Sequence, residues 1–241
     1  GNDDDAAQQQ RSHVQVQDSN DSGGYTGSVL IPDLLKKNYE ITVFDTFWYG
    51  TQHLESLENN KLNFIKGDVR DLKKISDTLI KFKPEMVLHL ACISNDASFE
   101  LNESLSTTIN MDSFEPLVLE CKNKNVRRFV FASSSSVYGV SDHKNVTEDH
   151  PLVPLTLYNK YKGLCEPKLL KNTDESFVGV VFRPATVCGF GPRLRLDLSV
   201  NILTHHAIKN KKMRVFGGSQ LRPNLHIKDY SRVCQLLIES P

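Results

Sequence analysis

The length, composition and charge of the chain exclude several classes of protein. It has 241 residues, 39% of them apolar and 24% charged, enough for one large α/β domain or a little more. Lysine plus arginine equals aspartate plus glutamate at 29 each, and this balance predicts no nucleic-acid partner. The sequence contains no apolar run near the roughly 18 residues that cross a bilayer, so we expect no membrane partner.

Five cysteines are scattered along the chain without a CxxC pair. An odd, dispersed set is typical of a reducing compartment and argues against a zinc site. The first residues are polar and acidic rather than basic and apolar, so we expect no secretory signal. These features predict a cytoplasmic protein.

Residues 1 to about 20 form a polar segment. Runs such as Gln8-Gln9-Gln10 lack periodicity, which favours disorder. Residues 13–17 alternate weakly between polar and apolar side chains and indicate a poor edge strand. We therefore expect a polar tail or a weak first strand over 1–20.

From Gly23 onward, two patterns alternate along the chain. Short apolar or β-branched runs predict strands, and longer segments with helical spacing lie between them. The predicted strands are 40–44, 62–65, 86–90, 128–131 and 177–182, and the predicted helices are 27–37, 71–82, about 101–122 and 158–171. Continuous apolar strands alternating with helices indicate the α/β class, with a doubly wound parallel sheet.

The pattern changes after Phe182. Residues 183–189 end a strand and open a loop, and residues 196–209 predict a further helix. Residues 213–218 predict a strand and turn, and residues 225–229 a short strand that enters a last helix.

A glycine turn precedes the first predicted helix. Gly24 and Gly27 enclose Tyr25 and Thr26, and glycines at this spacing let the backbone approach a pyrophosphate at a helix N-terminus. Asp45 ends the next predicted strand, where a carboxylate grips an adenosine ribose and favours NAD over NADP. An ordinary turn and a strand-end aspartate are the alternative, but the spacing favours binding.

Asp68 follows the predicted strand 62–65. One interpretation is that it accepts a hydrogen bond from an adenine amino group. The other is that it caps the next helix together with Asp71. The sequence leaves the two open.

Three polar side chains predict a proton-transfer site. Tyr158 precedes Lys162 by four positions, so both lie on one face of the predicted helix. A phenol ordinarily loses its proton near pH 10, and an ammonium group one turn away favours the phenolate. The serine run 133–136 follows an apolar strand whose carboxyl end faces the ligand crevice, where a serine can hold a substrate hydroxyl. Alone, each feature more often has no role in function. A tyrosine and a lysine four residues apart are usually only exposed to solvent, and a serine-rich turn usually hydrogen-bonds to its own backbone.

Taken together, these segments resemble the extended short-chain dehydrogenase/reductase family, in particular its NAD-dependent epimerase/dehydratase group. The resemblance runs from about Gly23 to the end of the chain. It rests on the order and spacing of Gly-Tyr-Thr-Gly-Ser, Asp45, 67–71, His89-Leu90-Ala91, Ser-Ser-Val-Tyr-Gly, Tyr-x-x-x-Lys, Arg183-Pro184, Leu221-Arg222 and 226–229.

The resemblance implies a role for each matching residue. Tyr158 would be the catalytic base and acid, Lys162 would hold the nicotinamide ribose, and Ser134 would bond the reacting sugar hydroxyl. Arg222 resembles an arginine that grips the substrate diphosphate, because its charged fork suits phosphate oxygens. The other cofactor-binding residues implied are Gly24, Tyr25, Thr26, Gly27, Asp45, Asp68, Val69, Leu90, Ala91, Cys92, Asn110 and Pro184.

The resemblance also implies an organisation. Residues 21–188 would form a Rossmann domain that binds NAD, and residues 189–241 a partial substrate-binding region whose last strand and helix return to the core. The family's chains normally continue well past residue 241, so this substrate-binding portion looks truncated. The helices near 101–122 and 158–171 match those that pair two subunits through a four-helix bundle, which implies a homodimer.

The implied activity is NAD-dependent epimerisation of a nucleotide sugar by transient hydride transfer. Ser135 and Ser136 replace the Asp-Glu pair of the family's dehydratases, which disfavours a dehydratase. Two alternatives stay open: an NAD(P)-dependent reductase of ketones or aldehydes, and a catalytically silent Rossmann domain that binds a nucleotide or a partner protein. Asp21 motivates the silent alternative, since it takes the first glycine position and would repel a pyrophosphate.

Overall fold

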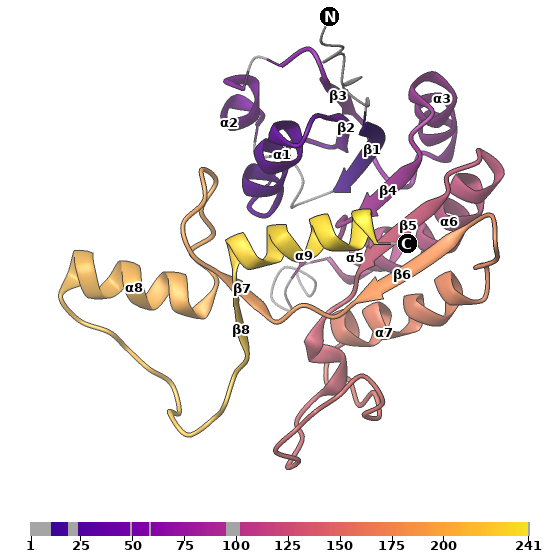
Figure 1. The fold of residues 1–241 in the computed structure, drawn as a ribbon. Helices are drawn as coiled ribbons and strands as arrows, with labels where there is room; N and C mark the ends of the chain where they lie inside the picture. The colour runs from indigo at the N-terminus through magenta and orange to yellow at the C-terminus, as the bar shows by residue number, and fades with distance from the viewer. Residues whose placement is uncertain (1–10, 19–23, 49, 58, 95–101, 241) are drawn as a thin grey trace, which may run out of the picture.

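The computed structural model of the protein describes residues 11–18, 24–48, 50–57, 59–94 and 102–240. Within them, a six-stranded sheet has the order β3-β2-β1-β4-β5-β6, and each neighbouring pair is parallel (Figure 1). The strands are β1 (Arg11–Asp18), β2 (Tyr39–Asp45), β3 (Leu62–Lys66), β4 (Met86–His89), β5 (Arg128–Ala132) and β6 (Val178–Phe182).

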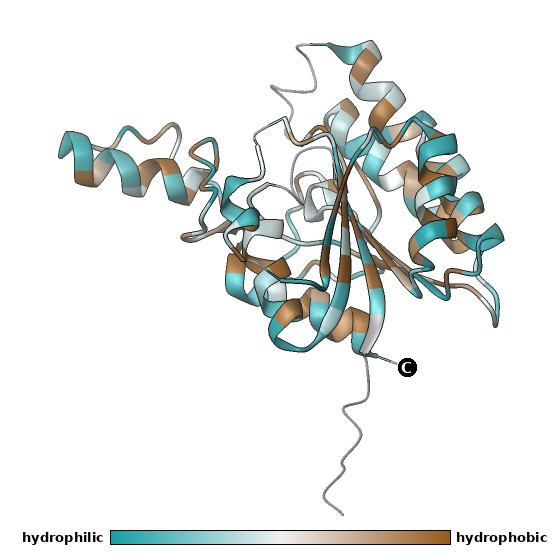
Figure 2. Cartoon of the chain, turned by 90° about the horizontal axis from the view of Figure 1, so that it is seen from above, coloured by the Kyte–Doolittle hydropathy of each residue, from teal (hydrophilic) through white to brown (hydrophobic). Residues whose placement is uncertain are grey.

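Helices cover both faces of this sheet. α1 (Gly27–Lys36) and α9 (Ile227–Glu239) pack on one face, and α3 (Leu72–Phe82), α6 (Phe114–Asn123) and α7 (Leu157–Leu170) pack on the other (Figure 1). Hydrophobic residues of the strands lie between the two helix layers (Figure 2). The predicted α/β class with a doubly wound parallel sheet is confirmed.

Shorter elements connect these layers. They are α2 (Gln52–Glu55), α5 (Glu103–Thr107), a π-helical turn η1 (Thr108–Asp112), a 3₁₀ turn η2 (Ser135–Tyr138), β7 (Thr186–Cys188), α8 (Ser199–Asn210) and β8 (Asn224–His226). The helical segment predicted over about 101–122 is confirmed from Glu103 onward, but it is not one regular α-helix. The π-helical turn η1 separates α5 from α6.

The structure corrects the expectation for the N-terminal segment. The first strand that was the alternative to disorder is present as β1, but it is a central strand and not an edge strand, because it pairs with β2 on one side and β4 on the other. Val14 and Val16 are fully buried under α1 and α9, so this face of β1 has the apolar character of a central strand. The expectations for residues 1–10 and for Asp21 lie outside the described residues.

The other face of β1 carries buried polar side chains. Gln17 lies with its Oε1 3.2 Å from Nδ1 of His89, and burial lowers the pKa of His89 to about 3, so the imidazole is neutral. Gln15 is fully buried, and neither atom of its amide has a hydrogen-bond partner within the described ranges. A buried amide without partners destabilises the fold. The polar residues Gln15 and Gln17 explain why the sequence of β1 does not have the pattern of a core strand.

We predict that Gln15→Met stabilises the protein. Methionine has a similar size and removes two unpartnered polar atoms, so the free energy of unfolding should rise by about 1–3 kcal/mol. Urea unfolding followed by circular dichroism measures this change. Gln17→Met is the matched control on the same strand face, because it also breaks the contact with His89 and should gain less. Equal effects at the two positions would contradict the interpretation.

The C-terminal part lies beside the main sheet. β7 and β8 form a two-stranded parallel sheet, and α8 projects away from the body (Figures 1 and 2). The strand predicted over 213–218 is wrong: residues 211–222 form an exposed connection between α8 and β8, with no neighbouring strand to pair with among the described residues. None of the described helices is long and apolar enough to cross a membrane.

Candidate active site

The candidate site lies at the carboxyl ends of the parallel strands. The order of the sheet reverses between β1 and β4, and ligands of such sheets bind in the crevice at this switch point. Asp45 ends β2, Gly67 and Asp68 follow β3, and the serine run follows β5. Leu90, Ala91 and Cys92 follow β4, and Pro184 follows β6. The topology therefore collects most of the predicted residues at one end of the sheet.

The glycine turn leads directly into α1, which begins at Gly27. Tyr25 is only 1% exposed, and its hydroxyl donates a hydrogen bond of 2.5 Å to the carbonyl of Gly189. The amide Nδ2 of Asn201 on α8 donates to the same hydroxyl at 3.2 Å. The hydroxyl of Tyr25 therefore links the start of α1 to the C-terminal part. The backbone of this turn is then the part that can face a phosphate.

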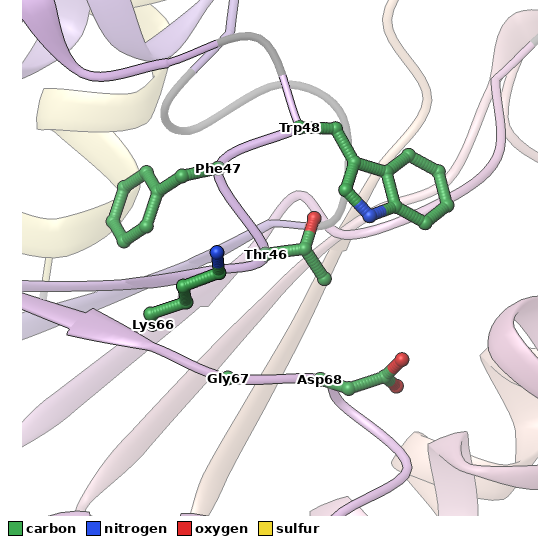
Figure 3. A pocket seen from close by; sticks show the side chains of 6 residues that line it. All are labelled: Thr46, Phe47, Trp48, Lys66, Gly67 and Asp68. Carbon is green, nitrogen blue, oxygen red and sulfur yellow. The ribbon is translucent and has the colours of Figure 1, made fainter.

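A pocket of about 500 Å³ opens where β2 and β3 end (Figure 3). The indole of Trp48 and the carboxylate of Asp68 point to one side of it, the ring of Phe47 points to the other, and the nitrogen of Lys66 points toward Thr46 (Figure 3). Gly67 is required here, since a Cβ would stand 2.3 Å from the ring of Phe44. The residues that line this pocket are Thr46, Phe47, Trp48, Lys66, Gly67 and Asp68.

The carboxylate of Asp45 lies next to this pocket and is 3% exposed. It accepts a hydrogen bond of 2.6 Å from the backbone N–H of Phe47. This bond fixes the turn that follows β2. As the last residue of β2, Asp45 stands where a ribose-binding carboxylate is expected.

Asp68 forms a two-pronged pair with Arg70. Nε of Arg70 lies 2.9 Å from Oδ1 and Nη2 lies 2.6 Å from Oδ2. The hydrogen bonds from this guanidinium lower the pKa of Asp68. The cap of α3 is Asp71, whose side chain accepts from the N–H of Lys74 at 2.9 Å, so the expectation that Asp68 caps this helix is wrong. Its contact with adenine stays a prediction.

The side chain of Asn110 hydrogen-bonds to the backbone of the segment that follows β4. Oδ1 of Asn110 accepts from the N–H of Ile93 at 2.8 Å, and its Nδ2 donates to the carbonyl of Ile93 at 3.0 Å. Asn110 belongs to the π-helical turn η1, and such turns often occur at functional sites. Leu90, Ala91 and Cys92 are buried, and Val69 packs against Ala91 and Ile93.

Lys162 is a nearly buried cation on α7. Only 4% of it is exposed, and its Nζ donates a hydrogen bond of 2.7 Å to the carbonyl of Ala132, the last residue of β5. The same Nζ stands 4.8 Å from the centre of the Phe131 ring. A buried ammonium group needs such partners, so Lys162 fixes α7 against the end of β5.

Glu166 lies one turn after Lys162 on α7 and binds Ser133, the residue that follows Ala132. Its Oε1 accepts from the hydroxyl of Ser133 at 2.5 Å and from Nε of Arg183 at 3.0 Å, and its Oε2 accepts from Nη2 of Arg183 at 2.6 Å. The carboxylate raises the pKa of Arg183, whose Nη1 also donates to the hydroxyl of Tyr138 at 2.7 Å. The sequence analysis missed Glu166, although Tyr158, Lys162 and Glu166 repeat at a spacing of four.

Ser134 and Ser136 connect to α7 through Asn159. The two serine Oγ atoms are 2.6 Å apart, and the hydroxyl of Ser136 donates to Oδ1 of Asn159 at 2.5 Å. Asn159 directly follows the half-buried Tyr158. The structure thus brings Ser134 to the same junction of β5 and α7 from which Tyr158 and Lys162 emerge.

The end of β6 meets the same junction. The carbonyl of Pro184 accepts a hydrogen bond of 2.9 Å from the N–H of Ser135. Arg222, by contrast, lies on the exposed connection before β8, and its side chain has no hydrogen bond or ion pair within the part of the chain that the structure describes. The structure does not bring Arg222 to the other predicted residues, and its diphosphate contact stays a prediction.

We predict that Glu166→Gln destabilises the protein by about 2–4 kcal/mol. The variant leaves the guanidinium of Arg183 without its buried counter-charge, and breaking one half of a buried ion pair is expensive. Chemical unfolding followed by circular dichroism measures the loss. The matched control is Glu115→Gln, which breaks partly exposed ion pairs to Lys168 on α7 and to Lys171, the residue that follows α7, and should lose less than about 1 kcal/mol. A similarly small loss for Glu166→Gln would refute the assigned role.

Comparison with known proteins gives a consistent result. Residues 22–241 match the family described as "NAD dependent epimerase/dehydratase family". A UDP-glucose 4-epimerase of Rhizobium leguminosarum bv. trifolii is 30% identical over 229 residues, which cover 88% of this chain and 67% of the relative. An uncharacterized UDP-glucose epimerase, YtcB, of Bacillus subtilis is 31% identical over 222 residues, which cover 86% of this chain and 67% of that protein.

Solved structures show the same fold. A UDP-N-acetylglucosamine 4-epimerase from Methanobrevibacter ruminantium, in complex with UDP-N-acetylmuramic acid, has a TM-score of 0.83 and 26% identity, and the match covers 96% of this chain and 74% of that one. A Thermus thermophilus UDP-glucose 4-epimerase in complex with NAD has a TM-score of 0.80 at 22% identity, which shows a shared fold, and the match covers 95% and 75% of the two chains. The chain spans about two thirds of the length of the curated relatives named above.

Proposed function

The chain belongs to the NAD-dependent epimerase/dehydratase family, and from this premise we propose that it is a 4-epimerase of UDP-sugars. The observation that supports the proposal is the junction of β5 and α7, where Lys162 bonds to Ala132 at the end of β5, and Ser134 connects through Ser136 to Asn159, the neighbour of Tyr158. The names of its relatives support a UDP-sugar as substrate. Within this proposal, residues 189–241 contribute to the sugar site, and Arg222 contacts the diphosphate.

The residues at the crevice fit NAD. The Trp48 pocket has room for a nucleobase, and the turn before α1 offers backbone N–H groups to a pyrophosphate. When bound, NAD supplies the redox chemistry by taking up and returning a hydride. We assign to its binding the residues Gly24, Tyr25, Thr26, Gly27, Asp45, Asp68, Val69, Leu90, Ala91, Cys92, Asn110, Tyr158, Lys162 and Pro184.

The protein's own contribution is positioning and proton transfer. Tyr158 takes the proton from the hydroxyl on the reacting sugar carbon and later returns it, as a general base and then a general acid. Lys162 has three N–H donors, of which the carbonyl of Ala132 uses one, and the others serve Tyr158 and the nicotinamide ribose. Ser134 holds the sugar hydroxyl against Tyr158, so that the proton moves over a hydrogen-bond distance.

We predict that Tyr158→Phe lowers the rate of epimerisation of UDP-glucose or UDP-N-acetylglucosamine at least about 100-fold, because general acid–base catalysis contributes factors of this size. Chromatographic separation of the two epimers, with NAD present, measures the rate. Tyr161→Phe is the matched control on the same helix, because the proposal gives the Tyr161 hydroxyl, which lies 3.5 Å from Oγ1 of Thr107, no part in proton transfer, so we expect a small effect. Unchanged turnover of Tyr158→Phe would remove this tyrosine from the mechanism.

The same assay distinguishes the reductase alternative. An epimerase returns the hydride to the sugar, so NADH should not be consumed in proportion to product. Stoichiometric loss of NADH with a ketone or an aldehyde would favour the reductase. The proposal includes a cytoplasmic setting, which the five free cysteine thiols support.

The proposal also includes a homodimer through the outer faces of α6 and α7, which pack side by side (Figure 1). Leu119 on α6 is 41% exposed and Leu164 on α7 is 42% exposed, and such side chains suit the centre of a four-helix bundle.

We predict that Leu164→Glu produces a monomer, because it would bury a charge in the bundle. Sedimentation velocity measures the mass of the species in solution. Leu236→Glu is the control, since Leu236 is 65% exposed on α9, which covers the opposite face of the sheet, and this variant should stay dimeric. A wild-type protein that sediments as a monomer would refute the dimer.

A further inference from the structure

Two neighbouring strands end on opposite charges at the pocket of Figure 3. Asp45 and Lys66 are the last residues of β2 and β3, and they are partners in the register of these parallel strands. Partners in register carry their side chains on the same face of a sheet. The carboxylate and the ammonium group therefore leave the two strand ends on the same face.

Two of the residues that line this pocket are charged, Lys66 and Asp68. The carboxylate of Asp68 is already paired, because Nε and Nη2 of Arg70 lie 2.9 Å and 2.6 Å from its two oxygens. Lys66 is exposed, and its ammonium group has no hydrogen bond or ion pair within the ranges that the structure describes. This cation can therefore meet an anionic group of a ligand.

The nitrogen of Lys66 points toward Thr46, which follows Asp45 in the chain (Figure 3). Asp45 is the carboxylate that we assign to the adenosine ribose. A substituent on the 2′-oxygen of a ribose held there would stand beside Asp45, in the space toward which Lys66 points. The 2′-phosphate that distinguishes NADP from NAD is such a substituent, and it is an anion.

We propose that Lys66 is a specificity-determining residue that binds the 2′-phosphate of NADP, so that this pocket takes NADP as well as NAD. The inference rests on the assignment of the crevice to a dinucleotide. Asp45 by itself repels that phosphate and favours NAD, because like charges repel. The ammonium group at the neighbouring strand end offsets this repulsion, since lysine binds phosphate as a point charge. Asp45 therefore sets the preference for NAD, and Lys66 keeps this preference small.

The test compares ligands that differ only in the 2′-phosphate. Calorimetric titration of the full chain with NAD and with NADP measures the ratio of the two dissociation constants, and the fluorescence of Trp48 in the same pocket is a second readout. We expect NADP to bind at most about 10-fold more weakly than NAD, because one ammonium group opposes one carboxylate at the strand ends. The pair 5′-AMP and adenosine 2′,5′-bisphosphate should give a similar ratio without any nicotinamide.

Variants of Lys66 separate its charge from its size. Lys66→Gln removes the charge and should shift the ratio against NADP by about 10- to 100-fold, the range of one hydrogen bond from a charged group. Lys66→Arg keeps the charge and should preserve the wild-type ratio. Lys81→Gln is the matched control in the last turn of α3, where the neighbouring Phe82 contacts His13 near the start of β1. It removes the same charge at the opposite end of the sheet and should leave the ratio unchanged.

Each result decides the proposal. If the wild type prefers NAD by more than the expected ratio, or if Lys66→Gln leaves the ratio unchanged, the role of Lys66 is overturned and the assignment of NAD stands. If neither dinucleotide binds the wild type, the proposed cofactor site and this inference fall together. If Lys66→Gln does not fold, Lys66→Ala decides in its place, since it also removes the charge.

Discussion

One face of a single helix determines the geometry of the candidate site. Lys162 and Glu166 on α7 hold Ala132 and Ser133 at the end of β5, and Asn159 holds the serine turn that follows. Since the three contacts are one turn or less apart on α7, the helix cannot slide along the strand without breaking all of them. Ser134 and Tyr158 owe their relative position to this register, and so does the chemistry proposed for them.

The contacts of Asn159, Lys162 and Glu166 place ionic and polar groups inside the protein. Burying Lys162 and the Glu166–Arg183 pair costs desolvation energy, which good geometry and additional hydrogen bonds offset only in part. Such networks are strongly destabilised when one partner is lost, so they define one arrangement of the site rather than several. On β1, the unpartnered amide of Gln15 shows the opposite case, a buried polar group that no contact within the described residues offsets.

The sequence predicted much of this fold because hydrophobic periodicity determines which faces are buried. The strands around Val43, Leu88 and Val130 and the helices α1 and α3 follow that pattern. β1 escaped it, because one of its two faces buries the polar side chains of Gln15 and Gln17 instead of apolar ones. The strand predicted over 213–218 fails for the complementary reason: its apolar residues find no partner strand among the described residues.

The site was predictable in part for the same kind of reason. Local motifs locate Asp45, Ser134, Tyr158 and Lys162, because each lies at a strand end or one helical turn from another. Glu166 and Asn159 needed the three-dimensional structure, since their partners are 33 and 23 residues away in the sequence. The π-helical turn at Asn110 has no equivalent signal, because it depends on how Asn110 holds Ile93.

The central claim is that the crevice binds NAD, and Trp48 offers a direct measurement. It is the only tryptophan of the chain, and it lines the pocket assigned to the adenosine. Titration with NAD should change its fluorescence saturably, and Asp45→Ala should shift the midpoint to higher concentration, because the ribose would lose its carboxylate partner. A folded protein whose fluorescence and calorimetric heat stay unchanged up to millimolar NAD would contradict the account and favour a silent domain.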